Sequence, residues 1–312
     1  MTVRGWLAPY LLLTLVWGAS FLFIEVGLQA LTPAQVALSR VLLGSLALLV
    51  VLAVSRVGLP RSWSLWKHLV VVGLTFNAVP FVLFAWAQTQ ISSILAGIWN
   101  ATTPLWTVVM GLVVFHAVRP TRRVVGGLLL GFAGAAVVLG PWTLFDEDLD
   151  SGFVLGTLAC LAATAGYGFA ATYTGRFLTG VPTRSPAQFP AAQLLVATGA
   201  LAVVVVPQGN APTSLPLEVV LALAGLGVLG TGLAYVLLYR VVALAGAVTA
   251  TTVTYLIPVV STTLGIVVLG ETLTWNEPVG ALLVLAGAWL TRPPARPVEP
   301  DPQPARGGPR PG

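Results

Sequence analysis

Two ionisable side chains, Glu25 and Arg40, lie inside strongly apolar stretches near the start of the chain. A charge at the centre of a membrane helix costs about 2.5–3.5 kcal/mol, so such residues tend to pair or to face water. A tight hairpin between Leu28 and Pro33 would leave the two side chains at depths that differ by about 6 Å, at ~1.5 Å per residue. We therefore expect a Glu25–Arg40 ion pair. It would serve as a structural clasp, or as a gate or proton site; alternatively Glu25 extends outward to the membrane surface.

Two further stretches, Ala96–Gly111 and Ala250–Gly265, combine an apolar background with polar residues and a central proline. Pro104 and Pro258 occupy equivalent positions in them, 154 residues apart. A single proline is tolerated in many membrane helices and means little alone. Its repetition in matching places of two halves favours a binding site between structural repeats, with both prolines kinking their helices.

Polar and aromatic residues also recur at helical spacing on several apolar stretches. One threonine on such a helix usually bonds to its own backbone, but the stripes together predict a cavity for an organic, partly apolar solute. The candidate cavity-lining and gating residues are Trp17, Phe21, Glu25, Arg40, Asn77, Phe84, Trp99, Asn100, Thr103, Tyr167, Thr231, Tyr235, Thr251, Thr254 and Tyr255, with helix kinks at Pro104 and Pro258.

The composition places these residues in a membrane. Of 312 residues, 57% are hydrophobic and only 8% are charged, whereas soluble proteins carry about 25% charged residues. The net charge of +5 does not indicate nucleic-acid binding, because the basic residues fall in short loops and a tail. The single cysteine, Cys160, excludes an intramolecular disulfide and a multi-cysteine metal site. We expect no metal and no cofactor.

The apolar segments that are long enough, or nearly so, to span a bilayer predict an all-α integral membrane protein with ten transmembrane helices. The expected spans are Trp6–Leu28, Pro33–Val54, Leu65–Ala87, Ile91–Phe115, Val124–Gly140, Gly152–Phe177, Ala187–Val206, Leu217–Tyr239, Gly246–Gly270 and Pro278–Leu290.

The distribution of charges predicts the orientation of these spans. With both termini in the cytoplasm, 14 of the 15 basic residues fall on the cytoplasmic side and only Arg40 lies within a span. The acidic loop Asp146–Asp150 then falls outside. Arginine outnumbers lysine fourteen to one, which favours a GC-rich bacterial source. We therefore expect a multi-pass protein of a bacterial cytoplasmic membrane.

The two halves of the chain repeat each other. Thr32–Gln35 reads TPAQ and Ser185–Gln188 reads SPAQ, and each offers a capping hydroxyl before a proline at the start of a span. Each half holds five expected spans, and because five is odd the halves would insert in opposite orientations. The expected organisation is a first repeat at 1–140, an acidic extracytoplasmic linker at 141–151, a second repeat at 152–291 and a disordered cytoplasmic tail at 292–312.

Several motifs in order point to one family. They are WGAS at Trp17–Ser20, the arginine at position 40 in the second span, and LGE at Leu269–Glu271 closing the ninth. These motifs and the arrangement of five spans in each half resemble those of the drug/metabolite transporter (DMT) superfamily, EamA type. The resemblance covers the whole chain except its tail. The resemblance implies a secondary exporter of small metabolites with a central cavity lined by both halves.

The sequence lacks the residues that would hydrolyse ATP, so transport is expected to be secondary. It has no phosphate-binding G-x-x-x-x-G-K-[ST] motif, and the only lysine, Lys67, follows no glycine-rich loop. We expect alternating-access export of small metabolites or amphipathic drugs, with the bilayer, the solute and a proton or exchanged solute as partners. The alternatives are a membrane-embedded enzyme and a non-transporting membrane scaffold. An enzyme is disfavoured because no span pairs a histidine with a carboxylate or cysteine, and His68 and His116 match no metal-ligand spacing.

Overall fold

The computed structural model describes residues 4–140, 151–210, 212 and 214–291, and every regular element within them is a helix. The acidic stretch at 141–150 and the tail at 292–312, for which we predicted an external linker and disorder, lie outside the described residues.

The helices of the first half are α1 (Arg4–Leu28), α2 (Pro33–Val54), α3 (Trp63–Val72), the π-helix η1 (Gly73–Ala78), α4 (Val79–Ala87), α5 (Ser93–Asn100), α6 (Thr103–Val113) and α7 (Arg122–Leu139). Those of the second half are α8 (Ser151–Phe177), α9 (Gln188–Val205) with the 3₁₀ turn η3 (Val206–Gln208), α10 (Leu217–Ala224), the π-helix η4 (Gly225–Leu233), α11 (Ala234–Thr251), α12 (Val253–Leu269) and α13 (Asn276–Leu290).

The helical segments coincide with the ten expected spans, although two of them are short. Among the described residues, eight helices are long and apolar enough to cross a membrane, counting α3–η1–α4 and α10–η4–α11 as continuous. The fourth expected span is interrupted at 101–102 and forms the half-helices α5 and α6. The tenth is α13, which has only 15 residues. The arrangement is therefore the expected all-helical bundle, with eight rather than ten helices of full spanning length.

The repeated capping sequences begin their helices in slightly different ways. Thr32 forms a full capping box with Gln35, and Pro33 follows it as the first helical residue of α2. In the second half, the Ser185 hydroxyl accepts from the backbone N–H of Ala187 at 3.3 Å, and α9 begins only at Gln188. The second helix thus starts two residues later than the repeat predicts, because its hydroxyl closes a turn before the helix.

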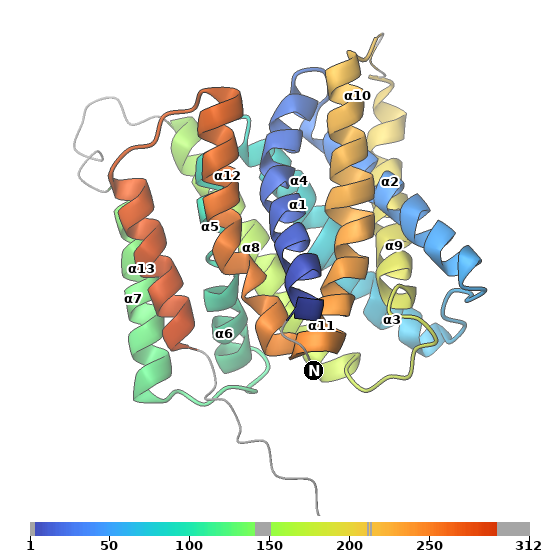
Figure 1. Cartoon of the computed structure of the whole chain (residues 1–312), viewed down its shortest axis with the longest axis horizontal. Coiled ribbons are helices and arrows are strands. Elements are labelled where there is room, and N and C mark those ends of the chain that lie inside the picture. The colour runs from blue at the N-terminus through green and yellow to red at the C-terminus, as the bar shows by residue number, and fades with distance from the viewer. Residues whose placement is uncertain (1–3, 141–150, 211, 213, 292–312) are drawn as a thin grey trace, which may run out of the picture.

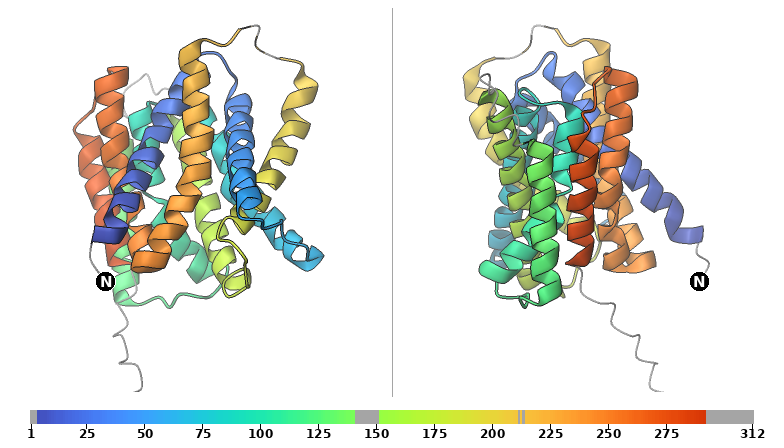
Figure 2. Two further views of the ribbon diagram at one scale, coloured as in Figure 1. Left: turned by 45° about the vertical axis from the view of Figure 1, so that its right-hand side comes forward. Right: turned by 90° about the vertical axis from the view of Figure 1, so that its left-hand side faces the viewer.

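The two halves pack against each other, and the main contacts that helices of the first half make have counterparts made by the equivalent helices of the second half. Helix α1 packs against α12, as α8 packs against α5 and α6; α2 packs against η4, as α9 packs against η1. The pairs α2 with α9, α5 with α12, and α7 with α13 each join equivalent helices of the two halves (Figures 1 and 2). This pattern is the one expected of two inverted repeats.

Glycines bring α7 and α13 into close contact at one edge of the molecule (Figure 1). A Cβ atom added at Gly134 would lie 2.6 Å from the backbone nitrogen of Val284, and one at Gly280 would lie 2.6 Å from the carbonyl oxygen of Gly134. Small residues at such positions let membrane helices approach until their backbones touch.

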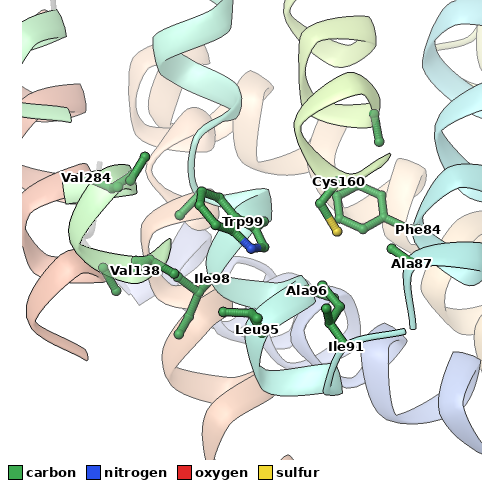
Figure 3. Packing of buried hydrophobic residues seen from close by; sticks show 14 of the residues in the cluster. Phe84, Ala87, Ile91, Leu95, Ala96, Ile98, Trp99, Val138, Cys160 and Val284 are labelled. Carbon is green, nitrogen blue, oxygen red and sulfur yellow. The ribbon is translucent and has the colours of Figure 1, made fainter. Parts of the chain in front are cut away.

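The largest of the buried hydrophobic clusters among the described residues includes Trp99 of α5 (Figure 3). Trp99 has no exposed surface, and Leu95, Ile98, Val138 and Val284 belong to the same cluster. The cluster therefore joins α5 to the α7–α13 pair. It also contains Phe21, Phe84 and Ile257, which line the cavity described next.

Candidate functional site

A cavity of about 590 Å³ lies between the two halves and is lined by helices of both. Twelve of the fifteen candidate residues line it: Trp17, Phe21, Arg40, Phe84, Asn100, Thr103, Tyr167, Thr231, Tyr235, Thr251, Thr254 and Tyr255.

Residues that line the cavity lie near the end of the bundle at which α1 begins, where α8 and α13 end (Figure 1). Thr174, three residues from the end of α8, and Thr291, just after α13, line it there. At the opposite end, side-chain contacts join the helices. Gln88, after α4, donates from Nε2 to the carbonyl oxygen of Phe21 at 2.9 Å and to the carboxylate of Glu25 at 3.3 Å.

The LGE motif forms a second contact at this closed end. Glu271 follows α12, and its carboxylate accepts from the backbone N–H of Ser93 at 2.8 Å and from the Ser93 hydroxyl at 3.0 Å. It also accepts from the N–H of Ile94 at 3.0 Å. These donors belong to the first turn of α5, where a negative charge is stabilised by unpaired N–H groups and by the helix dipole. Glu271 therefore ties the second half to the first.

Arg40 faces the cavity and does not pair with Glu25. Its Nε donates to the hydroxyl of Thr231 at 3.1 Å, and its guanidinium carbon lies 3.7 Å from the centre of the Phe81 ring. Within the described chain neither Arg40 nor Glu25 takes part in an ion pair. The predicted pair is wrong because it rested on depth alone: Arg40 points toward η4, whereas Glu25 points toward Gln88 after α4.

An aromatic wall runs beside Arg40. The rings of Phe21 and Phe84 lie edge to face at 5.7 Å between centroids, Phe84 stacks on Tyr167 at 5.9 Å, and Tyr167 contacts Phe76 at 5.1 Å. All four rings line the cavity. They give it an apolar surface on which a flat organic group can pack.

Comparison with known proteins identifies the family. The EamA-like transporter family matches residues 5–140 and 154–292, one match in each half. The chain belongs to the EamA-like transporter family. It is therefore a multi-pass membrane transporter.

This EamA-like transporter is similar to two proteins of known name. It is 28% identical over 289 residues to a protein of Archaeoglobus fulgidus named "Uncharacterized transporter", covering 89% of this chain and 93% of the relative. It is 27% identical over 308 residues to a Salmonella typhimurium protein named "Probable amino-acid metabolite efflux pump", covering 92% and 93%. A solved crystal structure matches with a TM-score of 0.63 at 19% identity, over 91% of this chain and 96% of that one, which shows a common fold.

Three candidate residues of this EamA-like transporter do not line the cavity. Glu25 lies at the closed end beside Gln88. Asn77 is fully buried in η1, where its Oδ1 accepts from the cavity-lining Tyr235 hydroxyl at 2.9 Å. Trp99 faces the hydrophobic core instead, because the helix turn that presents Asn100 to the cavity directs its neighbour away from it.

The two expected kinks differ in kind. Pro104 lines the cavity as the second residue of α6, immediately after the break between α5 and α6. Pro258 lies inside α12. The second half is interrupted earlier, first at Gly246, whose φ is +83°, and then at Thr252 between α11 and α12. The hydroxyls of Thr252 and Tyr10 lie 2.6 Å apart, which ties that break to α1. The prolines are equivalent in sequence but only one adjoins a break.

Sequence reasoning missed several residues that line the cavity. Ser20, Phe76, Thr174 and Thr291 belong to this group, as does Gln193. The alignment of the halves offered a signal for Gln193, which follows Ser185 by eight residues just as Arg40 follows Thr32. Ser20 lies one turn after Trp17 on the same helix face. Phe76 lies in the π-helix η1, whose wider turn changes the face that this residue shares with Phe84.

Proposed function

We propose that this protein is a secondary carrier that exports small organic metabolites by alternating access between its two halves. The observation that carries the proposal is a cavity lined by both halves that extends toward one end and is bounded at the other by contacts such as Glu271 with Ser93. A carrier needs a site that communicates with one side of the membrane at a time.

The charge distribution indicates which end of this carrier faces the cytoplasm. Under the positive-inside rule the N-terminus and the basic loops face the cytoplasm, and the cavity extends toward that side. The described conformation then corresponds to the cytoplasm-facing state in a bacterial cytoplasmic membrane. The moving units are the repeats at residues 1–140 and 152–291.

The change to the outward-facing state requires the closed end to open. The contact of Glu271 with the first turn of α5 must break, because it joins α12 of one half to α5 of the other. The cytoplasmic end of α8, which carries Thr174, and the end of α13, which Thr291 follows, must approach other helices to close the cavity.

The relative named as an amino-acid metabolite efflux pump supports export as the direction and small metabolites as the cargo. Because the sequence has no nucleotide-binding motif, the driving force would be a proton gradient or an exchanged solute.

Uptake into inside-out membrane vesicles tests the proposal, with a labelled pool of amino acids and their deaminated acids as probes. Ala171 lines the cavity, whereas Ala133 is exposed on α7 outside it. We expect saturable uptake by the wild type and by Ala133→Trp, and its loss in Ala171→Trp at equal expression. Uptake that does not saturate, or that is equal in the two tryptophan variants, would overturn the carrier.

The same vesicles separate the two modes of coupling. Uptake abolished by a protonophore assigns a proton gradient, and uptake that requires preloaded solute assigns exchange.

A further inference from the structure

The guanidinium group of Arg40 has unused hydrogen-bond donors within the cavity. An arginine carries five N–H donors, and the Nε donor bonds to Thr231. For the two terminal nitrogens, no hydrogen bond to the described part of the chain is recorded. Arg40 is only 9% exposed and lines the cavity. Donors held at such a place without a partner are costly unless a ligand or water satisfies them.

The charge of Arg40 is also uncompensated. Of the described residues that line the cavity, Arg40 is the one with a formal charge, and none is a carboxylate. The nearest contacts of the guanidinium are the Phe81 ring and a threonine hydroxyl, which are both neutral. A cavity with walls of low dielectric constant and one positive charge attracts anions and repels cations.

A second polar group occupies the position equivalent to Arg40 in the other repeat. Gln193 lies on α9, which packs against α2, and it lines the same cavity while only 6% exposed. No hydrogen bond from its amide to another described residue is recorded. The two repeats thus present a cation and a neutral amide to one space, a combination that can bind the two oxygens of a carboxylate.

We propose that Arg40, assisted by Gln193, binds the carboxylate of the transported solute, so that the substrates are organic monocarboxylates with an apolar or aromatic body. The body packs on the wall formed by Phe21, Phe84, Tyr167 and Phe76. A guanidinium binds a carboxylate through two parallel hydrogen bonds, which neither an amide nor an amine of the same shape can reproduce. This inference rests on the proposed function, and it excludes amphipathic cations as the main cargo.

Three probes of the same shape test it: 3-phenylpropanoate, its neutral amide 3-phenylpropanamide and the cation 3-phenylpropylamine. Binding to the purified full-length protein is measured by the shift in its thermal unfolding midpoint as each probe is titrated. We expect the acid to bind at least about tenfold more tightly than the amide or the amine. Equal affinity for the three probes, or tighter binding of the amine, would overturn the inference.

Variants then assign the preference to Arg40. We expect Arg40→Gln to lose the preference for the acid while still binding the amide, and Arg40→Lys to restore part of it because the charge remains without the planar fork. Arg122→Gln removes a positive charge on the exposed surface and should change nothing. An unchanged preference in Arg40→Gln would overturn the assignment. If Arg40→Gln does not fold, the order in which the wild-type protein binds the three probes still tests whether the cavity prefers a carboxylate.

Uptake of the same probes separates this inference from the proposed function. Saturable uptake of the amide and the amine that equals that of the acid, and that is lost in Ala171→Trp, keeps the carrier and overturns the carboxylate site. Tight binding of the acid without uptake of any probe supports the site and overturns the carrier.

Discussion

Glu271 and Ser93, which belong to different halves, are joined by two hydrogen bonds, one to the backbone N–H and one to the hydroxyl of Ser93. Hydrogen bonds to a charged group each contribute about 1.5–3 kcal/mol. The contact lies at the closed end of the bundle, so its free energy favours the conformation described here over one that is open at that end.

Glu271→Gln should shift this balance, because the amide keeps one acceptor oxygen but loses the charge that the start of α5 stabilises. The readout is the labelling of Ser20→Cys, a cavity position, by a membrane-impermeant thiol reagent added from outside intact cells. Cys160 is fully buried and is replaced by alanine in all variants. We expect faster labelling in Glu271→Gln.

Glu277→Gln serves as the matched control. The Glu277 carboxylate accepts from the backbone N–H of Thr274 at 3.3 Å, and within the described residues its hydrogen bonds stay in this segment, so it does not join the halves. Labelling rates that are the same with and without Glu271→Gln would show that this contact does not hold the outer end closed.

Asn77 and Tyr235 connect η1 of one half to α11 of the other. Tyr235→Phe removes the donor and leaves the buried Asn77 oxygen unpaired, which should lower the free energy of unfolding by about 1–3 kcal/mol. No hydrogen bond is recorded for the Tyr239 hydroxyl within the described chain, so Tyr239→Phe should have a smaller effect. Thermal unfolding in detergent provides the comparison, and equal midpoints for the two variants would contradict the expectation.

The glycines between α7 and α13 predict a contrast in stability. Gly134→Ala places a Cβ 2.6 Å from the Val284 backbone and should destabilise the protein by forcing the helices apart. Gly126→Ala meets nothing within 4 Å and should be neutral or stabilising by up to about 1 kcal/mol, because alanine favours a helix. The unfolding midpoints of the two variants check this, and a stable Gly134→Ala would show that the helix pair separates easily.

The two prolines should respond differently to substitution. Pro104 begins α6, where a missing N–H costs little, so Pro104→Ala should leave the transport rate almost unchanged. Pro258 lies inside α12, and Pro258→Ala restores a backbone hydrogen bond and stiffens the helix. We expect slower transport in Pro258→Ala, measured as solute uptake into vesicles. Identical rates in the two variants would refute the distinction.

The core should be sensitive at Trp99, which was a cavity candidate by sequence. Because this side chain is fully buried, Trp99→Ala should cost about 3–5 kcal/mol in stability. Trp63 is 86% exposed, and Trp63→Ala should cost far less. Both are measured by thermal unfolding, and a small loss for Trp99→Ala would mean that the surrounding helices collapse into the space.

The sequence allowed the helical segments, the repeat and part of the cavity lining to be predicted: most of the candidate residues line the cavity, but many other lining residues were not candidates. The lengths of the apolar segments predict the helices, and the matching stretches around Pro104 and Pro258 predict the repeat. Polar residues on one helix face indicate the cavity lining. Rotation about the helix axis was the missing information for Glu25 and Arg40, since depth alone cannot say which neighbour a side chain faces. Trp99 and Asn100 show the same limit, because adjacent residues point in different directions.

The π-helices η1 and η4 occur in the third span of each half. Each contains a wider turn than an α-helix, and converting it to a regular helix would rotate the side chains beyond it by about 100° per residue displaced. Thr231, which holds the Nε of Arg40, lies within η4, and Asn77, which holds Tyr235, lies within η1. A change of helical winding in either segment would therefore release a cavity residue from its partner without any movement of the bundle as a whole. Amide hydrogen exchange that is faster at 73–78 and 225–233 than in the flanking turns would reveal such rewinding.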